Sequence, residues 1–233
     1  GGWGRRAGFR GSRYFRRGGM SSPGGGGAVF REEGMRGGEP RPLSKYGYLV
    51  AYCDPSFQSS SKNDYKAIKL WGKVGTELHC LAAFVRQCSV AEMVRWFYDL
   101  HERVPENVVV EYYIEANFLQ DILLDEFTRE GKLRGYQLPI RADRRKKPDK
   151  FQRIEAISPL WERGFVFYNA RMQRDPDMLA AIDQTLCFEK GMSGHDDAPD
   201  ADEGAIYKLQ QRTREQAFVP SIGRRHISSK RVW

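Results

Sequence analysis

The chain has 233 residues, of which 40% are hydrophobic, and a formal net charge of +8. This length and apolar content predict one folded domain with a substantial core. No apolar run approaches 18 residues and no hydrophobic signal region opens the chain, which excludes a membrane-spanning helix and a recognisable secretion signal. The four cysteines have no CxxC spacing and are expected to be reduced core thiols of an intracellular protein: Cys53, Cys80, Cys88 and Cys187.

The basic charge is concentrated at the two ends and in one internal segment. Residues 1–45 carry ten basic and three acidic side chains, residues 141–153 seven and two, and residues 205–233 seven and one. The remaining body is therefore acidic. Such a distribution fits a metal site approached by a polyanion, although solvated charged faces explain any single run about as well.

The first 42 residues hold 14 of the 24 glycines, with arginines between them. Such a composition cannot bury enough apolar surface to order itself, so we expect residues 1–42 to form a disordered tail. The tail is either a flexible nucleic-acid-binding arm or an incomplete remnant without a role. The folded domain is predicted over 43–212, followed by a basic tail over 213–233.

Three short strands are predicted at the start of the domain. The first covers 47–54, the second 65–72 and the third 77–86, and Gly75 with Thr76 forms a plausible turn between the last two. Consecutive strands joined by short links indicate an antiparallel meander.

Helices and strands then alternate. Ser89 begins a helix whose apolar residues recur at helical spacing to Val104, and Glu92 completes a capping box. The later elements are a strand at 108–114, a helix at 118–131, a strand at 136–140, a helix at 150–163 bent at Pro159, a strand at 165–168 and helices at 176–189 and 197–211. The order β-β-β-α-β-α-β-α predicts an α/β fold with a ribonuclease H-like mixed sheet flanked by helices.

Acidic residues follow two of the predicted strands. Asp54 closes the first strand and Glu115 closes the strand at 108–114, so both are expected at the carboxyl edge of one sheet. The last helix begins with Asp197 and Asp200 on one face, and Asp196 faces elsewhere but could reach a second ion. Each residue also has a plainer interpretation, as a turn residue, a surface carboxylate or an acid that complements the helix dipole.

The ligand types indicate the metal. Carboxylate oxygens without histidine or cysteine at zinc spacing favour Mg²⁺ or Mn²⁺. Two such ions would polarise a phosphodiester, generate hydroxide and stabilise the leaving oxygen, so Asp54, Glu115, Asp197 and Asp200 are the predicted catalytic residues. His195 is a candidate proton shuttle or outer ligand.

At these residues the chain resembles the C-terminal nuclease domain of the large terminase subunit of tailed bacteriophages. The matching stretches are Tyr52–Phe57, Lys62–Ile68, Tyr113–Asn117, Arg153–Ile154, Gly164–Phe167 and Gly194–Ala201, with Val29–Phe30 before them. The resemblance implies a metal-dependent endonuclease that cuts concatemeric viral double-stranded DNA while a capsid fills. It implies metal ligation by Asp54, Glu115 and the aspartates at 196–200, and assigns Asp64 either an indirect role at the metal site or a surface position.

The same resemblance implies a portal ring and a small terminase subunit as partners, and the cytoplasm of a bacterial host as the location. One motif of the family's packaging motor is missing, because no GxxxxGK[ST] phosphate loop occurs in the 233 residues. We therefore expect a nuclease fragment, a truncated prophage copy or a reading frame with a wrong start, and no DNA translocation by this chain alone.

The internal basic segment is the predicted DNA contact. It lies in a loop and helix start, and its predicted phosphate-binding residues are Arg144, Arg145, Lys146, Lys147, Lys150 and Arg153. A solvated loop is the alternative. At the level of function, the alternatives are another ribonuclease H-like nuclease (a junction resolvase or an RNA–DNA hybrid nuclease) and a non-enzymatic nucleic-acid-binding protein that uses its Gly/Arg arm.

Overall fold

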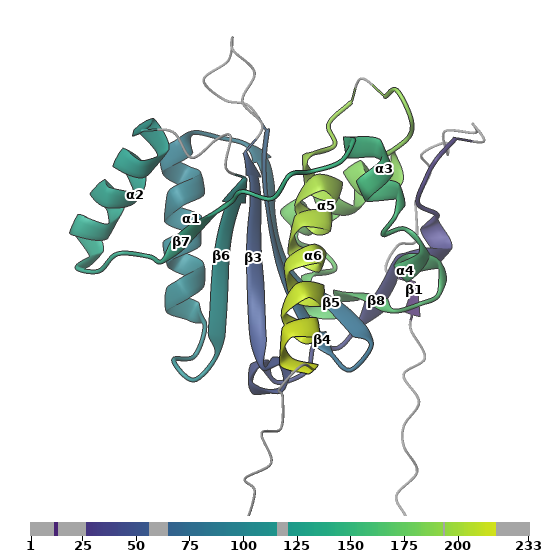
Figure 1. Cartoon of the computed structure of the whole chain (residues 1–233), viewed down its shortest axis with the longest axis horizontal. Helices are drawn as coiled ribbons and strands as arrows, with labels where there is room; N and C mark the ends of the chain where they lie inside the picture. The colour runs from purple at the N-terminus through teal and green to yellow at the C-terminus, as the bar shows by residue number, and fades with distance from the viewer. Residues whose placement is uncertain (1–11, 14–26, 56–64, 116–120, 193, 218–233) are drawn as a thin grey trace, which may run out of the picture.

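The computed structural model describes residues 12–13, 27–55, 65–115, 121–192 and 194–217 and shows one mixed sheet with helices on both faces (Figure 1). The strands are β1 (Ser12–Arg13), β2 (Arg36–Gly38), β3 (Tyr48–Pro55), β4 (Tyr65–Val74), β5 (Glu77–Gln87), β6 (Val109–Glu115), β7 (Ile140–Asp143) and β8 (Val166–Asn169). The helices are α1 (Val90–Arg103), α2 (Asp121–Arg134), α3 (Lys150–Glu155), α4 (Pro159–Glu162), α5 (Pro176–Leu186) and α6 (Asp197–Ala217), with short 3-10 turns η1 (Glu32–Gly34), η2 (Leu43–Tyr46) and η4 (Ala170–Met172).

The strand order across the sheet is β1-β2-β8-β5-β4-β3-β6-β7. β3, β4 and β5 form the predicted antiparallel meander, and Gly75 makes the tight turn between β4 and β5 with a positive φ of 61° that glycine adopts readily. β6 returns parallel to β3 after the α1 crossover, and β7 lies parallel to β6. The predicted neighbourhood of the first strand and the 108–114 strand is confirmed.

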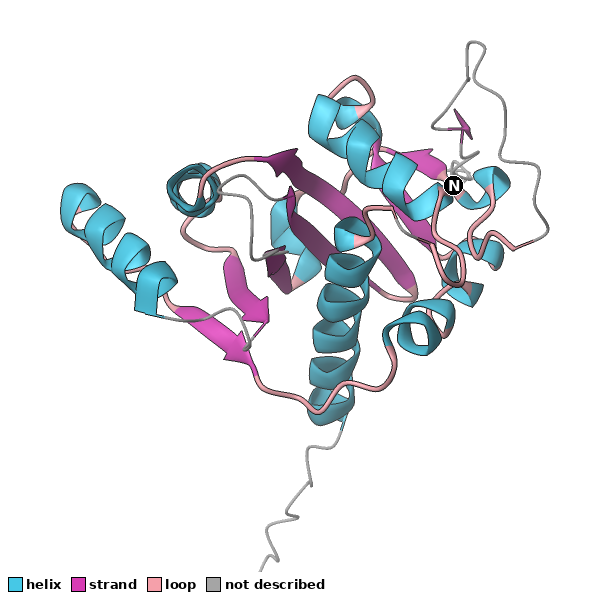
Figure 2. Cartoon of the chain, turned by 90° about the horizontal axis from the view of Figure 1, so that it is seen from above, coloured by secondary structure: helices cyan, strands magenta, loops and turns pink. Residues whose placement is uncertain are grey.

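The two faces of the sheet are covered by different helices (Figure 2). α1 and α2 pack on one face, and α5 and α6 pack on the other with α3 and α4 beside them. α1 begins as predicted, because the Ser89 hydroxyl accepts from the Glu92 amide at 3.2 Å and the Glu92 carboxylate accepts from the Ser89 amide at 3.0 Å. Across the described residues, no helix has both the length and the apolar character needed to cross a bilayer.

The predicted start of the folded domain at residue 43 is too late. Phe30 is 3% exposed and Met35 is 1% exposed, and β2 pairs in parallel with β8, so the domain includes residues from about 27 onward. Gly38 suits this position because a Cβ atom there would lie only 3.2 Å from the Phe167 ring. Apart from 12–13, residues 1–26 of the predicted disordered tail lie outside the described residues.

Several predicted boundaries also differ from the structure. The helix predicted over 150–163 is two short helices, because Pro159 begins α4 and cannot continue the α3 hydrogen bonds. The strand predicted at 136–140 begins at Ile140, after Pro139, which has no amide hydrogen to donate to the sheet. α2 runs past Gly131 to Arg134 and ends at Gly135, which has a φ of +81°.

The last helix and the cysteines also agree only in part with the predictions. α6 continues to Ala217, beyond the predicted domain end at residue 212, and residues 218–233 of the predicted basic tail lie outside the described residues. Cys53, Cys80 and Cys88 are buried free thiols as predicted, whereas Cys187 is an exposed one.

Candidate metal centre

Three carboxylates meet at the carboxyl edge of the central strands. Cys53 on β3 is paired with Ile114 on β6, so the following residues, Asp54 and Glu115, leave neighbouring strands side by side. Asp200 on the first turns of α6 completes the group, and one oxygen from each of the three carboxylates lies within 4.8 Å of the others. In Figure 1 this edge is at the top of the sheet, where α6 begins.

α6 is held on the sheet at several points. Asp202 accepts hydrogen bonds from Trp71 Nε1 at 2.8 Å and pairs with the Lys69 ammonium at 3.0 Å, and all of these side chains are fully buried. Gly204 allows close approach, because a Cβ atom there would lie 2.3 Å from the Tyr52 ring. These contacts set the rotation of the helix, and therefore the direction in which Asp200 projects.

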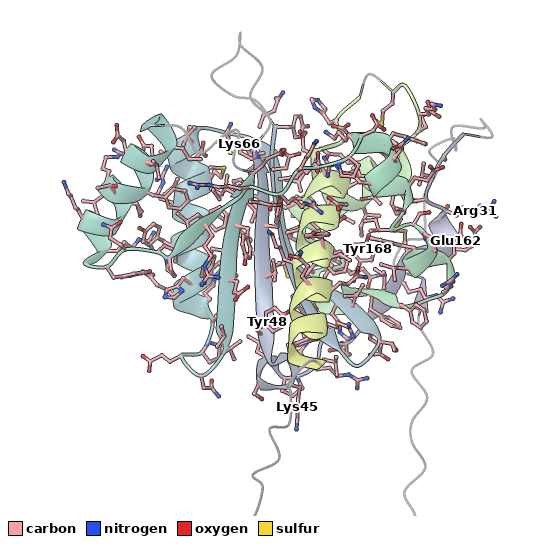
Figure 3. The ribbon with its side chains drawn as sticks, viewed as in Figure 1. Arg31, Lys45, Tyr48, Lys66, Glu162 and Tyr168 are labelled. Atoms are coloured by element: carbon pink, nitrogen blue, oxygen red, sulfur yellow. The ribbon has the colours of Figure 1, made fainter. Side chains whose placement is uncertain are left out.

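Two labelled residues in Figure 3 mark the ends of this arrangement. Tyr48 lies beside the distal part of α6, and its hydroxyl donates to the Leu209 carbonyl at 2.9 Å. Lys66 lies at the edge that carries the acids, opposite Pro55 on β3, and its ammonium donates to the Cys88 carbonyl at 2.8 Å. α6 is therefore tied to the sheet at Leu209 as well as beside the candidate site, and Lys66 ties the acid-bearing edge to Cys88, just before α1.

The other predicted ligands lie at the same helix start. Asp197 is 3% exposed, and its Oδ2 lies 3.9 Å from Nδ1 of the exposed His195, whose ring packs against Tyr65 at 4.0 Å. Asp196 is partly exposed and pairs with Lys150 at 2.7 Å. Neither aspartate belongs to the group within 4.8 Å, and Asp64 lies outside the described residues.

The charges of this cluster are strongly perturbed. Burial raises the pKa of Asp54 well above its usual range, and the nearby Asp200 carboxylate raises it further. Burial, the largest single influence, acts in the same direction on Asp200, but the hydrogen bonds and charge of Arg153 together with the charges of Lys150 and Lys147 outweigh it and lower the pKa of Asp200 to about 2. Carboxylates held this close together repel one another unless cations lie between them. Bound metal ions or the side chains of lysine and arginine can provide that positive charge.

The basic segment that runs from the end of β7 into α3 supplies those cations and crosses this edge of the sheet (Figure 1). The Arg153 guanidinium donates to both oxygens of Asp200 and, at 2.7 Å, to Glu203. The Arg145 guanidinium donates to both oxygens of Glu203 and stacks over the Tyr207 ring at 4.0 Å.

The four other predicted DNA contacts fall into two pairs. Lys147 lies 3.2 Å from Glu115, and Lys150 lies 3.2 Å from Asp200. Arg144 and Lys146 are exposed and make no ion pair with any described residue. Of the six predicted DNA contacts, four therefore pair with acids of the chain and two face solvent.

Several residues of this centre were not predicted from the sequence. Asp143 ends β7 opposite Glu115 and accepts hydrogen bonds from the Tyr52 hydroxyl and from Lys208, each at 2.7 Å. Asp202 and Glu203 anchor α6. The one available signal was Lys69, a lysine in the middle of an apolar strand, which requires a buried acidic partner.

The donor set fits a hard divalent cation. Asp54, Glu115 and Asp200 offer only carboxylate oxygens, at a spacing that one or two ions can bridge. Among the described residues, no histidine or cysteine joins this group, which disfavours zinc and favours Mg²⁺ or Mn²⁺.

Comparison with solved structures identifies the fold. A large terminase from a thermophilic bacteriophage (crystal form 2) superposes with a TM-score of 0.50 at 13% sequence identity, over 78% of this chain and 43% of that chain. Such a likeness shows a shared fold, and it confirms the predicted ribonuclease H-like mixed sheet flanked by helices. This chain spans less than half the length of that phage terminase.

Two further solved structures are similar. The human cytomegalovirus terminase nuclease domain matches at 14% identity over 69% of this chain and 82% of that domain, with a TM-score of 0.49. The large terminase nuclease of another thermophilic phage, G20c, matches at 16% identity over 78% of this chain and 98% of that one, with a TM-score of 0.48. No protein-family model and no curated protein sequence matches the chain.

Proposed function

We propose that this chain is a divalent-metal-dependent endonuclease of the large terminase type that cuts double-stranded viral DNA during genome packaging. The observation that carries the proposal is the convergence of Asp54, Glu115 and Asp200 within 4.8 Å at the carboxyl edge of the central strands. Two further observations support the proposal. The chain shares its fold with the large terminase of a thermophilic bacteriophage. The three acids also lie at the sheet edge where open α/β sheets bind ligands.

The acidic residues would bind two cations. Asp54, Glu115 and Asp200 would hold the first ion, and Asp196 or Asp197 would contribute to a second. When bound, Mg²⁺ or Mn²⁺ ions supply a hydroxide nucleophile and stabilise the charge that develops on the phosphate. Because Asp54 is buried, its carboxylate needs such a neighbouring cation to stay ionised. His195 is exposed beside Asp197 and would carry protons to solvent.

The basic segment would position DNA over this edge. Arg144 and Lys146 are exposed and are the proposed direct phosphate contacts, and Lys147 and Lys150 border the acids. Arg145 and Arg153 are better suited to orient Asp200 through their shared partner Glu203. Neutralising Arg144 and Lys146 together should reduce the slope of log affinity against log salt by about 2.

The packaging context belongs to the same proposal. A portal ring, a small terminase subunit and the cytoplasm of a bacterial host are the expected setting of an enzyme of this type. Because the 233 residues contain no phosphate loop, the ATPase that drives translocation would lie outside them.

Plasmid nicking tests the proposed activity. The wild type should convert supercoiled plasmid to open circles with Mn²⁺ or Mg²⁺, and EDTA should abolish the conversion. Asp54→Asn removes one ligand at nearly constant volume and should eliminate detectable nicking. Asp125→Asn, which changes an exposed carboxylate on α2, should retain full activity.

The substrate distinguishes the alternatives. Cleavage of duplex DNA is expected, whereas cleavage confined to RNA–DNA hybrids or four-way junctions would favour another ribonuclease H-like nuclease. Equal nicking by the wild type and Asp54→Asn, or none by the wild type across metals and salt concentrations, would count against the proposed nuclease, and a wild type that binds DNA without cutting it would be a non-enzymatic nucleic-acid-binding protein.

A further inference from the structure

Two lysines occupy the positions next to the carboxylates proposed to bind metal. The Lys147 ammonium lies 3.2 Å from Glu115 Oε1 and 3.9 Å from Asp200 Oδ1. The Lys150 ammonium lies 3.2 Å from Asp200 Oδ2 and 2.7 Å from Asp196 Oδ1. Within the described part of the chain, every ion pair of these two lysines is with an acid of this centre.

The neighbouring arginines are held differently. Arg153 and Arg145 both bind Glu203, an acid outside the group of three, and Arg153 also binds Asp200; their side chains are only 7% and 12% exposed. Their planar groups are locked by several hydrogen bonds each. The lysines are compact charges on flexible stems. The Lys150 side chain is 39% exposed, so its ammonium group can move without disturbing the fold, whereas the Lys147 side chain is 12% exposed and its ammonium lies over the Tyr52 ring.

A divalent ion and these ammonium groups would compete for the same oxygens. A divalent ion held by Glu115 or Asp200 would need the carboxylate oxygens that Lys147 and Lys150 contact. The doubly charged ion attracts the carboxylates more strongly and repels the ammonium beside it. The displaced lysines would still lie on the segment from β7 to α3, which crosses the sheet edge where a nucleic acid would approach.

We propose that Lys147 and Lys150 are internal counter-ions of these acids, that a divalent ion competes with them for the same carboxylates, and that metal binding releases them to contact DNA phosphates. This inference rests on the proposed nuclease function and adds an order of events to it. The acids are neutralised by lysines until metal arrives, and the freed lysines then raise the affinity for DNA. Metal and DNA binding would thus be coupled through two side chains.

Metal affinity without DNA is the first test. Isothermal titration calorimetry with Mn²⁺ should show tighter binding to Lys147→Met and to Lys150→Met than to the wild type, by at least about fivefold. Lys146→Met removes the same charge one residue away, from an exposed side chain without an acidic partner among the described residues, and should keep the wild-type affinity.

Thermal unfolding provides a readout that also checks folding. Both lysine variants should melt below the wild type without metal, because the acids lose a counter-ion, and should gain more than the wild type when Mn²⁺ is added. Lys150→Met is the variant least able to disturb the fold, because its side chain is the more exposed of the two.

DNA binding is the second test. Fluorescence anisotropy with a short duplex should show that Ca²⁺ makes the salt dependence of wild-type binding steeper. In the Lys147→Met/Lys150→Met double variant this increase should be smaller by about 2 in the slope of log affinity against log salt. A gel would confirm that the duplex stays intact.

The outcomes separate the two proposals. If the wild type binds Mn²⁺ and both lysine variants bind it with the same affinity, the counter-ion role is wrong and the metal centre stands. If the wild type binds no metal at all, both proposals fail. If metal affinity rises as expected but the salt dependence is the same in the wild type and the double variant, the release toward DNA is wrong.

Discussion

The two faces of the sheet are built from different chemistry. On the α1 and α2 face most buried side chains are apolar, as Phe97, Ile114 and Phe127 illustrate. The buried polar ones include Lys66 and His79, which bond to the Cys88 carbonyl and the Tyr46 hydroxyl. On the α6 face an apolar stripe that includes Ala201 and Ala205 is accompanied by acids that are themselves buried. The buried acids on α6 are Asp197, Asp200, Asp202 and Glu203.

This difference shows what each face specifies. Apolar contacts have no direction, so the α1 face stabilises the fold while tolerating small shifts. Buried carboxylates require partners at defined positions, and α6 finds them in Lys69, Arg153 and Arg145. The charged face therefore determines where Asp200 points, and the apolar face provides stability without contacting the site.

The largest effect should come from breaking the buried pair under α6. Lys69→Met leaves the fully buried Asp202 carboxylate with Trp71 as its hydrogen-bond donor and without its cationic partner. We expect a loss of about 3–5 kcal/mol in the free energy of unfolding, measured by urea denaturation.

A double variant shows whether the pair or its geometry matters. Lys69→Met/Asp202→Leu replaces both charges with apolar groups and should recover most of the lost stability. If Lys69→Met lowers the free energy of unfolding by less than about 1 kcal/mol, the Lys69–Asp202 pair does not hold α6 on the sheet. The buried charges would then not explain how the α6 face differs from the α1 and α2 face.

A smaller effect is expected at Glu203, which holds both arginines. Glu203→Gln weakens the hydrogen bonds from Arg145 and Arg153 and frees Arg153 to move with Asp200. Metal affinity should fall by about 10–100-fold, as for other residues that orient metal ligands, and calorimetry with Mn²⁺ measures it. Glu106→Gln, an exposed change between α1 and β6, should leave the affinity unchanged; an equal loss in both variants would contradict the positioning role.

The parts of this picture that the sequence predicted depend on local patterns. The capping box at Ser89 and the turn at Gly75 require only neighbours along the chain, and both are confirmed. Asp54 and Glu115 were predicted to lie together because neighbouring parallel strands have their carboxyl ends at the same sheet edge. The apolar runs and the helix between them are enough to predict two such strands.

The choice among the aspartates at the α6 start required long-range information. Asp196, Asp197 and Asp200 differ in rotation about the helix axis, and that rotation is set by the pairing of Asp202 with Lys69 and by the contact of Gly204 with Tyr52, both between residues more than 130 positions apart in the chain. No local pattern contains these contacts.

The basic segment and the N-terminus show the same limit. Arg145 and Arg153 look like free cations in the sequence, yet their partner Glu203 lies on α6. Phe30 and Met35 are buried, but they are scattered apolar residues in a glycine-rich stretch. The average composition of that stretch predicts disorder and gives no sign that these two residues are buried. A charge or an anchor cannot be assigned to solvent before its distant partners are known.

The smallest predicted change in stability is at β6, where neighbouring residues belong to the two different faces of the sheet. Ile114 and Glu115 are adjacent on β6, but Ile114 packs on the apolar face and Glu115 belongs to the acidic group. Ile114→Val should lower the free energy of unfolding by about 0.5–1.5 kcal/mol in urea and leave Mn²⁺ affinity unchanged. Glu115→Gln, one residue further on, should lose metal affinity. A loss of affinity in Ile114→Val would mean that packing on the apolar face also positions the ligands, so the two faces could not be treated as separate.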